Sequence, residues 1–374
     1  MGGRPASFSD RLPPAGRQTL QRFFPLLLFL LSLGPRLVAL GRYVTPDEMV
    51  WVFRSLQFRE ALLAGRWAGT LVAGHPGVTT TWLGTLAMSL QLTFSPASRE
   101  PYLWLTKVAA LTPDNVEAFR RLALFLSGGR LAIAVVNSLG IVAMYWLARR
   151  VWPARAALVG GLLLAFDPFL IGLSGLFHVD GLSATFATLA LLALAVGLTG
   201  GRRPAPWLAA SGVMAGLAAL SKTPTLALLP LAGLALLWAA LREGRPWPRR
   251  AAALLGRGLL WGAAMAATVL LLYPALWVGP AAVLATVGGS ANRHLDEALR
   301  ETFFLGRAVF DPGPLFYPVV VAWRLSPLVW LAALPGAWLL WRRRPAGAWR
   351  RPGWFLVALF VVWAGLFLLA ITPA

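Results

Sequence analysis

The chain has 374 residues, of which 58% are hydrophobic and only 13% are charged, and its mean hydropathy is +0.68. Several apolar stretches reach about 18 residues or more, so the composition excludes a soluble globular protein and predicts an all-α polytopic membrane protein. The net charge of +20 fits cytoplasmic loops and anionic headgroups better than nucleic acid. The absence of cysteine excludes disulfides and thiolate metal sites.

The N-terminal 22 residues are basic and lead directly into the first apolar stretch. Their charged residues are Arg4, Arg11, Arg17, Arg22 and Asp10. Residues 23–40 are long enough to cross a bilayer and lack a clear signal-peptide cleavage site, so we expect a cytoplasmic tail at 1–22 followed by a signal anchor. The first helix would then end on the outer side.

Residues 42–121 are more polar and predict a large first external loop. Two stretches within this loop, 51–64 and 79–92, have the pattern of amphipathic helices, which we expect to lie in the membrane interface. Turns at 64–67 and 74–77, rich in Gly and Pro, separate the two helices.

The rest of the chain predicts eight further spans, which makes about nine in a bundle that extends over residues 23–374. After the first span, the expected spans are residues 122–147, 156–175, 181–198, 207–220, 223–241, 251–278, 315–340 and 354–371. A second external loop is expected at residues 279–314.

Alternating these spans from a cytoplasmic N-terminus gives a test of the topology. The inner side then holds 19 of the 34 cations, but only Asp10 and Glu243 among the 14 acids. The net charge is therefore +17 inside and +3 outside, in line with the positive-inside rule. The three histidines and 12 acids fall outside, which favours chemistry on that face. The alternative is that these residues fall outside only because external loops are the polar parts of the chain, without any role in chemistry.

Short polar motifs occur at the expected outer ends of the spans. They are TPDE at 45–48, AGRW at 64–67, GHPG at 74–77, AFDPF at 165–169, HVDG at 178–181, SKTP at 221–224, FLG at 304–306 and DPGPLFYP at 311–318. Each is short, but their order and placement resemble the GT-C superfamily of membrane-embedded glycosyltransferases. The resemblance is to the family 39-like branch of the protein O-mannosyltransferases and the lipid A aminoarabinose transferase.

The resemblance implies an inverting transfer of one sugar from a polyprenyl-phosphate donor to a hydroxyl of a lipid, glycan or protein acceptor. The reaction is expected at the outer face of the plasma membrane, with the donor, the acceptor and membrane lipids as partners. By position, Asp47 matches the acid that serves this family as general base. Family members usually continue into further spans, so we expect this chain to be a shortened or C-terminally truncated member.

The residue types at 45–48 suit a base on independent grounds. A sugar hydroxyl needs a carboxylate within hydrogen-bond reach to take its proton as it attacks the anomeric carbon. Asp47 and Glu48 are the candidate catalytic acids, with Asp47 favoured. The alternative is that Pro46 and both acids form the first turn of a helix. Both descriptions can hold, with Glu48 as the helix-stabilising partner.

Asp180 is the third candidate catalytic residue, because an ionisable group near the hydrocarbon is costly and so favours function. The alternative is an N-cap or a His–Asp pair that holds a loop. His178, two residues earlier, and His75 in the first external loop are candidate substrate-binding residues. Asp167 precedes Pro168 and predicts a helix kink with a capping acid.

Lys222 interrupts two apolar stretches, and Pro224 prevents a continuous helix there. A broken helix in a membrane usually lines a cavity, where a lone ammonium suits the donor phosphate. A lysine that reaches for the interface is the alternative. Arginines on the outer side, Arg54 and Arg324 among them, are expected to neutralise the phosphate or to contact headgroups.

No cofactor is expected, and a divalent metal is a minor alternative because the available ligands lack recognised spacing. Those ligands are His75, His178, His294, Asp296 and Glu297. Two rival functions remain, a transporter or flippase for a lipid-linked or anionic solute and a non-catalytic membrane scaffold. Lys222 and Asp180 also suit a transporter, but no inverted repeat is visible and two long external loops favour a reaction site.

Overall fold

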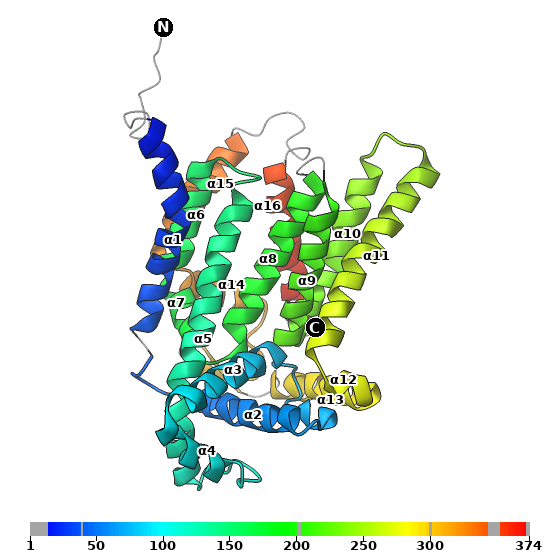
Figure 1. Ribbon diagram of the computed structural model, residues 1–374. Helices are drawn as coiled ribbons and strands as arrows, with labels where there is room; N and C mark the ends of the chain where they lie inside the picture. Colours follow the sequence, from blue (N-terminus) through cyan, green and yellow to red (C-terminus); the bar gives the residue numbers. More distant parts are fainter. Residues whose placement is uncertain (1–13, 39, 200–202, 299–300, 343–351, 372–374) are drawn as a thin grey trace.

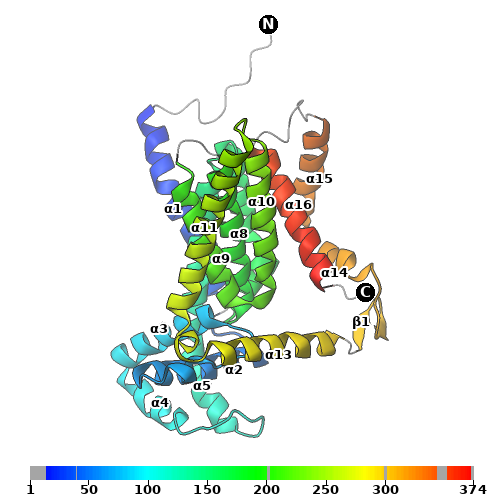
Figure 2. The same cartoon turned by 90° about the vertical axis from the view of Figure 1, so that its right-hand side faces the viewer.

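The computed structural model describes residues 14–38, 40–199, 203–298, 301–342 and 352–371. Long helices run side by side as a bundle, and shorter helices lie across one end of it (Figures 1 and 2). The first helix begins at the opposite end of the bundle (Figure 1). We call the layer of crossing helices, residues 46–105, the end layer.

Apolar helices form the bundle. They are α1 (Pro14–Leu37), α5 (Val116–Ala148), α6 (Ala154–Phe166), α7 (Pro168–Gly175), α8 (Val179–Thr199), α9 (Ala205–Ser221), α10 (Leu228–Leu241), α11 (Trp247–Leu272), α15 (Pro327–Arg342) and α16 (Pro352–Ile371). Helix α9 packs against both α8 and α11. A Cβ at Gly212 of α9 would lie 2.3 Å from the carbonyl oxygen of Trp261, so the close approach of α9 and α11 requires glycine there.

The described residues contain four helical segments long and apolar enough to cross a membrane, or six if two bent helix pairs each count as one span. The four are Val116–Ala148, Val179–Thr199, Thr223–Leu241 and Trp247–Leu272, and the bent pairs are α6 with α7 and α14 with the first part of α15. This confirms an all-α membrane protein. Nine spans and the sidedness of the topology stay predictions.

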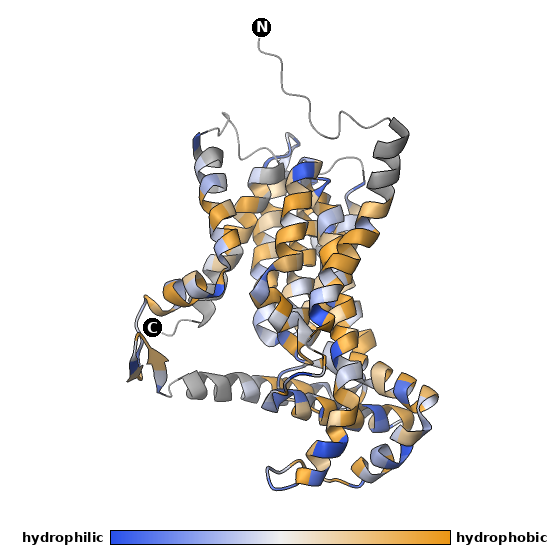
Figure 3. Cartoon of the chain, turned by 90° about the vertical axis from the view of Figure 1, so that its left-hand side faces the viewer, coloured by the Kyte–Doolittle hydropathy of each residue, from blue (hydrophilic) through white to orange (hydrophobic). Residues whose placement is uncertain are grey.

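The end layer contains the two helices predicted in the first external loop. They are α2 (Pro46–Leu63) and α3 (Val78–Phe94), joined by η2 (Trp67–Thr70) and followed by η3 (Pro96–Ser98) and α4 (Arg99–Leu105). Both helices begin earlier than expected and lie across the end of the bundle (Figure 1). Figure 3 shows hydrophobic residues along the bundle and a mixture of hydrophilic and hydrophobic residues in the end layer.

Two predicted interruptions are present at the end of the bundle nearest the end layer. Helices α6 and α7 meet at 58°, and Asp167 caps α7 by accepting a hydrogen bond from the backbone N–H of Leu170 at 2.9 Å. Helix α9 ends at Lys222, whose backbone is extended, and the 3-10 turn η4 (Thr223–Ala227) leads into α10. The kink with a capping acid and the break at Lys222 are therefore confirmed.

The chain leaves the bundle after α11. It continues through α12 (Ala275–Val278), α13 (Pro280–Ala298), the strands β1 (Thr302–Phe304) and β2 (Arg307–Val309), and α14 (Phe316–Arg324). The strands pair antiparallel, with Thr302 opposite Val309. Figure 2 shows α13 extending away from the bundle to this hairpin, after which the chain returns through α14. Helices α14 and α15 are bent by 107°, so the stretch predicted as a single span at 315–340 is a bent helix pair.

When α6 and α7 are taken as one bent pair, the bundle helices from α5 to α11 alternate in direction (Figure 1). The connections from α5 to α6 and from α10 to α11 lie at the end of the bundle where α1 begins, and the turn between α7 and α8 lies near the end layer (Figure 1). The part of the expected cytoplasmic tail up to residue 13, and Arg202, Arg343, Arg344, Arg350 and Arg351, lie outside the described residues, as do the side chains of His294, Asp296 and Glu297.

Candidate active site

Glu48 anchors the start of α2 in the interior of the protein. Its side chain is fully buried, and that of Arg130 is 1% exposed. Arg130 in α5 donates from Nε to Oε1 of Glu48 at 2.7 Å and from Nη2 to Oε2 at 2.6 Å. This two-point geometry is the strongest arrangement an arginine and a carboxylate can adopt, so it fixes the end layer against the bundle.

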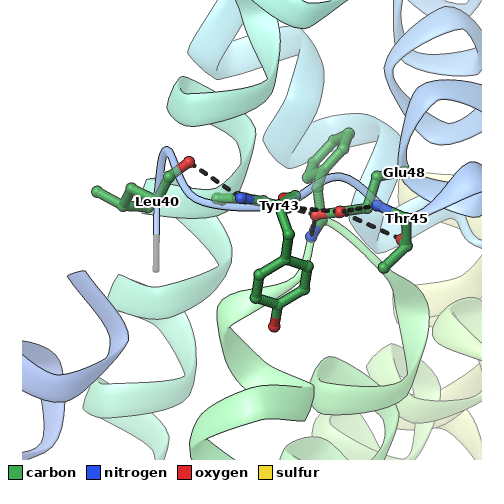
Figure 4. A network of polar contacts seen from close by, with 6 residues as sticks. Leu40, Tyr43, Thr45 and Glu48 are labelled. Atoms are coloured by element: carbon green, nitrogen blue, oxygen red, sulfur yellow. Dashed lines mark hydrogen bonds and ion pairs between the residues drawn. The ribbon is translucent and has the colours of Figure 1, made fainter. Parts of the chain in front are cut away.

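Backbone groups surround the same ion pair (Figure 4). Glu48 accepts from the backbone N–H of Phe177 at 2.8 Å and from that of Thr45 at 3.0 Å, and it completes a capping box with Thr45. Arg130 also donates to the carbonyl oxygens of Leu40, at 3.0 Å, and of Tyr43. One ion pair therefore holds the chain before α2 and the turn before α8.

These contacts explain the acidity of Glu48. Burial alone would raise the pKa of its carboxyl, but the hydrogen bonds from Arg130, Thr45 and Phe177 and the charge of Arg130 outweigh burial and hold the pKa below the usual 4.5. The carboxylate thus stays ionised, with both oxygens occupied by donors. This arrangement agrees with the helix-stabilising role considered for Glu48.

Asp47 has the opposite environment. Its side chain is 77% exposed, and Oδ2 lies 3.8 Å from Nε2 of His178. Because Glu48 is the next residue and is immobilised, the backbone of Asp47 is held at a defined position while its carboxylate stays open. The structure therefore places an accessible carboxylate at a rigid helix start.

His178 and Lys222 both contact Asp180, in the first turn of α8. Nδ1 of His178 lies 3.3 Å from Oδ2 of Asp180, and Nζ of Lys222 lies 2.6 Å from Oδ1. The side chains of Asp180 and Lys222 are 32% and 38% exposed. The structure therefore brings together four of the predicted site residues as a continuous row, Asp47, His178, Asp180 and Lys222, which we call the polar row.

The turn that carries His75 lies against the break at Lys222. The backbone N–H of Gly77 donates to the carbonyl oxygen of Ser221 at 3.2 Å, and the hydroxyl groups of Thr79 and Ser221 are 2.7 Å apart. The loop predicted to be external thus packs directly on the residue before Lys222. Sequence reasoning placed both segments on one side of the membrane but gave no contact between them.

Trp51 of α2 connects the remaining predicted residues. Its ring packs edge-on against the imidazole of His75, with ring centres 5.3 Å apart, and against that of His178 at 6.2 Å. The guanidinium of Arg54 lies 4.7 Å from the centre of the Trp51 ring, which is a cation–π distance. Burial lowers the pKa of Arg54, and the nearby charge of Asp47 opposes that shift.

Arg324 lies apart from this group in the contacts of the described residues. Its guanidinium is 5.5 Å from the ring centre of Phe169 in α7, and no contact with the polar row is recorded among those residues. The structure thus gathers Asp47, Glu48, His75, His178, Asp180, Lys222 and Arg54 at one end of the bundle.

Sequence reasoning missed Arg130 and Arg36. Arg36 in α1 is 1% exposed and donates to Ser174 Oγ at 2.6 Å and to the carbonyl oxygen of Ser32 at 2.6 Å. It therefore braces α1 against α7. The available signal was the cost of an arginine inside an apolar stretch, which requires a buried partner.

A metal centre has no support among the described side chains, which include no group of three or more His, Cys, Asp or Glu residues placed to hold a metal ion. The row itself alternates in charge, with a carboxylate on each side of His178 and an ammonium at its end.

Comparison with known families gives a match for the middle of the chain. Residues 126–273 match the sequence model of the family described as dolichyl-phosphate-mannose-protein mannosyltransferase. A search among curated proteins gave no match. The matched segment contains Arg130, His178, Asp180 and Lys222, whereas Asp47 and His75 precede it. The segment covers 148 of the 374 residues, and over that length the chain is similar to membrane glycosyltransferases of this family.

Proposed function

We propose that the protein transfers a sugar from a polyprenyl-phosphate-linked donor to a hydroxyl group of an acceptor, with inversion at the anomeric carbon. The observation that carries the proposal is the polar row, which joins an exposed carboxylate on the end layer to an ammonium at a helix break. Both lie where the bundle meets the end layer. The similarity of residues 126–273 to a mannosyltransferase family supports the same class of reaction.

Asp47 is the proposed general base. When an acceptor hydroxyl attacks the anomeric carbon, its proton passes to a carboxylate oxygen of Asp47, and the bond between that carbon and the phosphate oxygen breaks. A single attack from the face opposite the phosphate inverts the anomeric centre. A well-placed base contributes about 10²- to 10⁴-fold to such a step, and the exposed fraction of 77% leaves room for an acceptor.

Lys222 and Arg54 are the proposed phosphate-binding residues. The leaving group is a phosphate whose negative charge grows as the bond to the sugar breaks, so cations near it stabilise the transition state. Nζ of Lys222 is partly exposed and already bound to one carboxylate oxygen, which a phosphate oxygen can replace. Arg54 lies over Trp51, on the α2 side of the site.

The remaining assignments follow from placement. His75 is partly exposed and packs against the buried ring of Trp51, four residues after Asp47 in α2, so His75 is the proposed contact to the sugar or the acceptor. Glu48 acts through the position of Asp47. The site would face the outer side of the plasma membrane, as the charge distribution predicts, and the polyprenyl chain would lie in the bilayer. Lipid, glycan and protein acceptors all supply the required hydroxyl.

The decisive experiment compares Asp47→Asn with Asp114→Asn. Asp114 is also exposed and lies in the same expected external loop, so its change controls for the loss of one negative charge. Purified protein in lipid nanodiscs is given polyprenyl-phosphate sugars and a membrane extract as acceptor source. We expect Asp47→Asn to lose at least about 10²-fold in transfer rate and Asp114→Asn to keep it. Equal transfer rates for Asp47→Asn and the unchanged protein would refute the assignment of Asp47 as the general base.

A transporter of a lipid-linked or anionic solute is the second candidate. The observation that favours it is the Lys222–Asp180 ion pair at the break between α9 and α10, since broken helices with ionisable groups line the sites of many transporters. Solute uptake into proteoliposomes separates the two functions. Uptake that persists in the Asp47→Asn variant, with no sugar transfer by the unchanged protein, would favour transport.

A further inference from the structure

His178 is the only described side chain in ion-pair contact with Asp47. The same imidazole touches a second carboxylate through its other nitrogen, with Nε2 3.8 Å from Oδ2 of Asp47 and Nδ1 3.3 Å from Oδ2 of Asp180. The contact with Asp180 is the shorter of the two, and the contact with Asp47 is beyond hydrogen-bond distance. The two nitrogens are therefore not equivalent.

This asymmetry determines where the imidazole proton lies. The tautomer of a histidine follows from the hydrogen bond made by one nitrogen, which leaves the other nitrogen with a lone pair. Nδ1 is the nitrogen nearer to a carboxylate oxygen, which favours the tautomer with the hydrogen on Nδ1. Nε2 then directs its lone pair toward Asp47.

We propose that His178 receives the proton that Asp47 takes from the acceptor, an inference that rests on the proposed transferase function. Two carboxylates flank the imidazole of His178. Once the acceptor hydroxyl has given its proton to Asp47, the new O–H of Asp47 faces the lone pair of Nε2. Transfer of that proton regenerates the Asp47 carboxylate and produces an imidazolium between two negative charges.

The proton balance of the cycle closes without any other reagent. The oxygen–hydrogen bond of the acceptor breaks, a bond forms between that oxygen and the anomeric carbon, and the electron pair of the broken sugar–phosphate bond leaves with the polyprenyl phosphate. The proton moves from Asp47 to Nε2 of His178 and then to water, because the His178 side chain is 20% exposed.

The surroundings of His178 are suited to a temporary positive charge. Asp47 faces it from α2 and Asp180 from α8, while Lys222 binds the other oxygen of Asp180 and keeps that carboxylate oriented. Arg54 and His75 contact the Trp51 ring, against which His178 also packs. The two carboxylates stabilise the positive charge that His178 carries after it receives the proton.

The tautomer gives a test that does not depend on activity. The chain has only three histidines, so nitrogen NMR of protein labelled with ¹⁵N-histidine in nanodiscs shows three imidazoles, and His75→Gln and His178→Gln assign two of them. We expect His178 to carry its hydrogen on Nδ1 at neutral pH. We expect Asp180→Asn to change the tautomer or its population. A His178 imidazole protonated on Nε2 at rest would overturn the proposal.

Activity provides the second test, through rescue. His178→Ala should slow transfer by less than the roughly 10²- to 10⁴-fold expected for loss of a base, and millimolar imidazole in the buffer should restore part of the rate. Rescue should grow with pH as more imidazole becomes neutral. A purely structural His178 predicts no rescue and an unchanged pH profile. If Asp47→Asn abolishes transfer but His178→Ala shows no rescue by imidazole and an unchanged pH profile, Asp47 remains the base and proton transfer to His178 is refuted.

Discussion

The ring of Trp51 leaves no space for a side chain at position 77. A Cβ built on Gly77 would lie 2.0 Å from Cη2 of Trp51, and the backbone of Gly77 has φ of +56°. Glycine alone adopts this conformation readily and fits this contact. Since Gly77 also donates to Ser221 beside Lys222, one small residue lets α2, α3 and the α9 break meet at the site.

Gly77→Ala should therefore damage both the fold of the end layer and the site. The left-handed backbone costs a non-glycine residue about 1–3 kcal/mol, and Trp51 must also move, which shifts His75 and His178. We expect a lower unfolding temperature and loss of sugar transfer. Gly160→Ala is the matched control, because a Cβ there meets nothing within 4 Å and helix propensity favours alanine by about 0.5–1 kcal/mol. Equal stability of the two variants would contradict this account.

The Glu48–Arg130 pair makes a second prediction, about stability. Removal of one partner leaves a buried charge without its counter-charge, which typically costs about 3–5 kcal/mol. Arg130→Met and Glu48→Met should each lower the unfolding temperature in nanodiscs more than Glu48→Met with Arg130→Met together. The double variant should still be inactive, since the N–H groups of Thr45 and Phe177 lose their acceptor. If the fall in unfolding temperature of the double variant equalled the sum of the two single falls, Glu48 and Arg130 would not be energetically coupled.

The acidity of Glu48 makes a third prediction, about pH. Its pKa in the folded protein lies below the usual 4.5, so the folded state binds this proton less readily than the unfolded state. The pair therefore stabilises the protein fully above about pH 4.5, and this contribution is lost as the pH falls from there through the lowered pKa. Unfolding temperatures measured from pH 6 to pH 3 should fall more steeply for the unchanged protein than for Glu48→Gln. Parallel curves would contradict the assignment.

The sequence predicted the individual features of this site better than their contacts. TPDE as a helix start, Asp167 as a capping acid and Lys222 at a break all follow from local rules about caps, proline and apolar length, and the structure has each of them. The alternation of apolar spans also placed these residues at one end of the bundle. Local rules suffice here because each feature depends on neighbours within about four residues.

The partners across the fold could not be predicted in this way. Arg130 lies 82 positions from Glu48, and Lys222 lies 42 positions from Asp180, so only the packing of α2, α5, α8 and α9 brings them together. The apolar length rule also treated residues 315–340 as one span, although Ser326 and Pro327 allow a bend of 107° between α14 and α15. Long-range contacts require the packing of whole helices, which periodicity does not specify.

Lys222 makes the last prediction, about donor binding. The chain has two lysines, Lys107 and Lys222, and Lys107 is exposed at the end of α4, so Lys107→Met is a matched control for the loss of one ammonium group. A charge-assisted hydrogen bond to phosphate contributes about 1.5–3 kcal/mol, so Lys222→Met should weaken the binding of a polyprenyl phosphate about 10- to 100-fold. Titration of the protein in nanodiscs with decaprenyl phosphate, followed by tryptophan fluorescence, measures this affinity.

Asp180→Asn separates phosphate binding from the ion pair that now occupies Lys222. Nζ of Lys222 lies 2.6 Å from Oδ1 of Asp180, and a phosphate must compete with that carboxylate. Loss of the carboxylate charge should therefore leave decaprenyl phosphate affinity unchanged or raise it, whereas Lys222→Met lowers it. Sugar transfer should still fall in Asp180→Asn, because His178 loses the carboxylate that orients it. If both variants lowered the affinity equally, Lys222 would act only as the partner of Asp180, and the donor phosphate would bind elsewhere in the site.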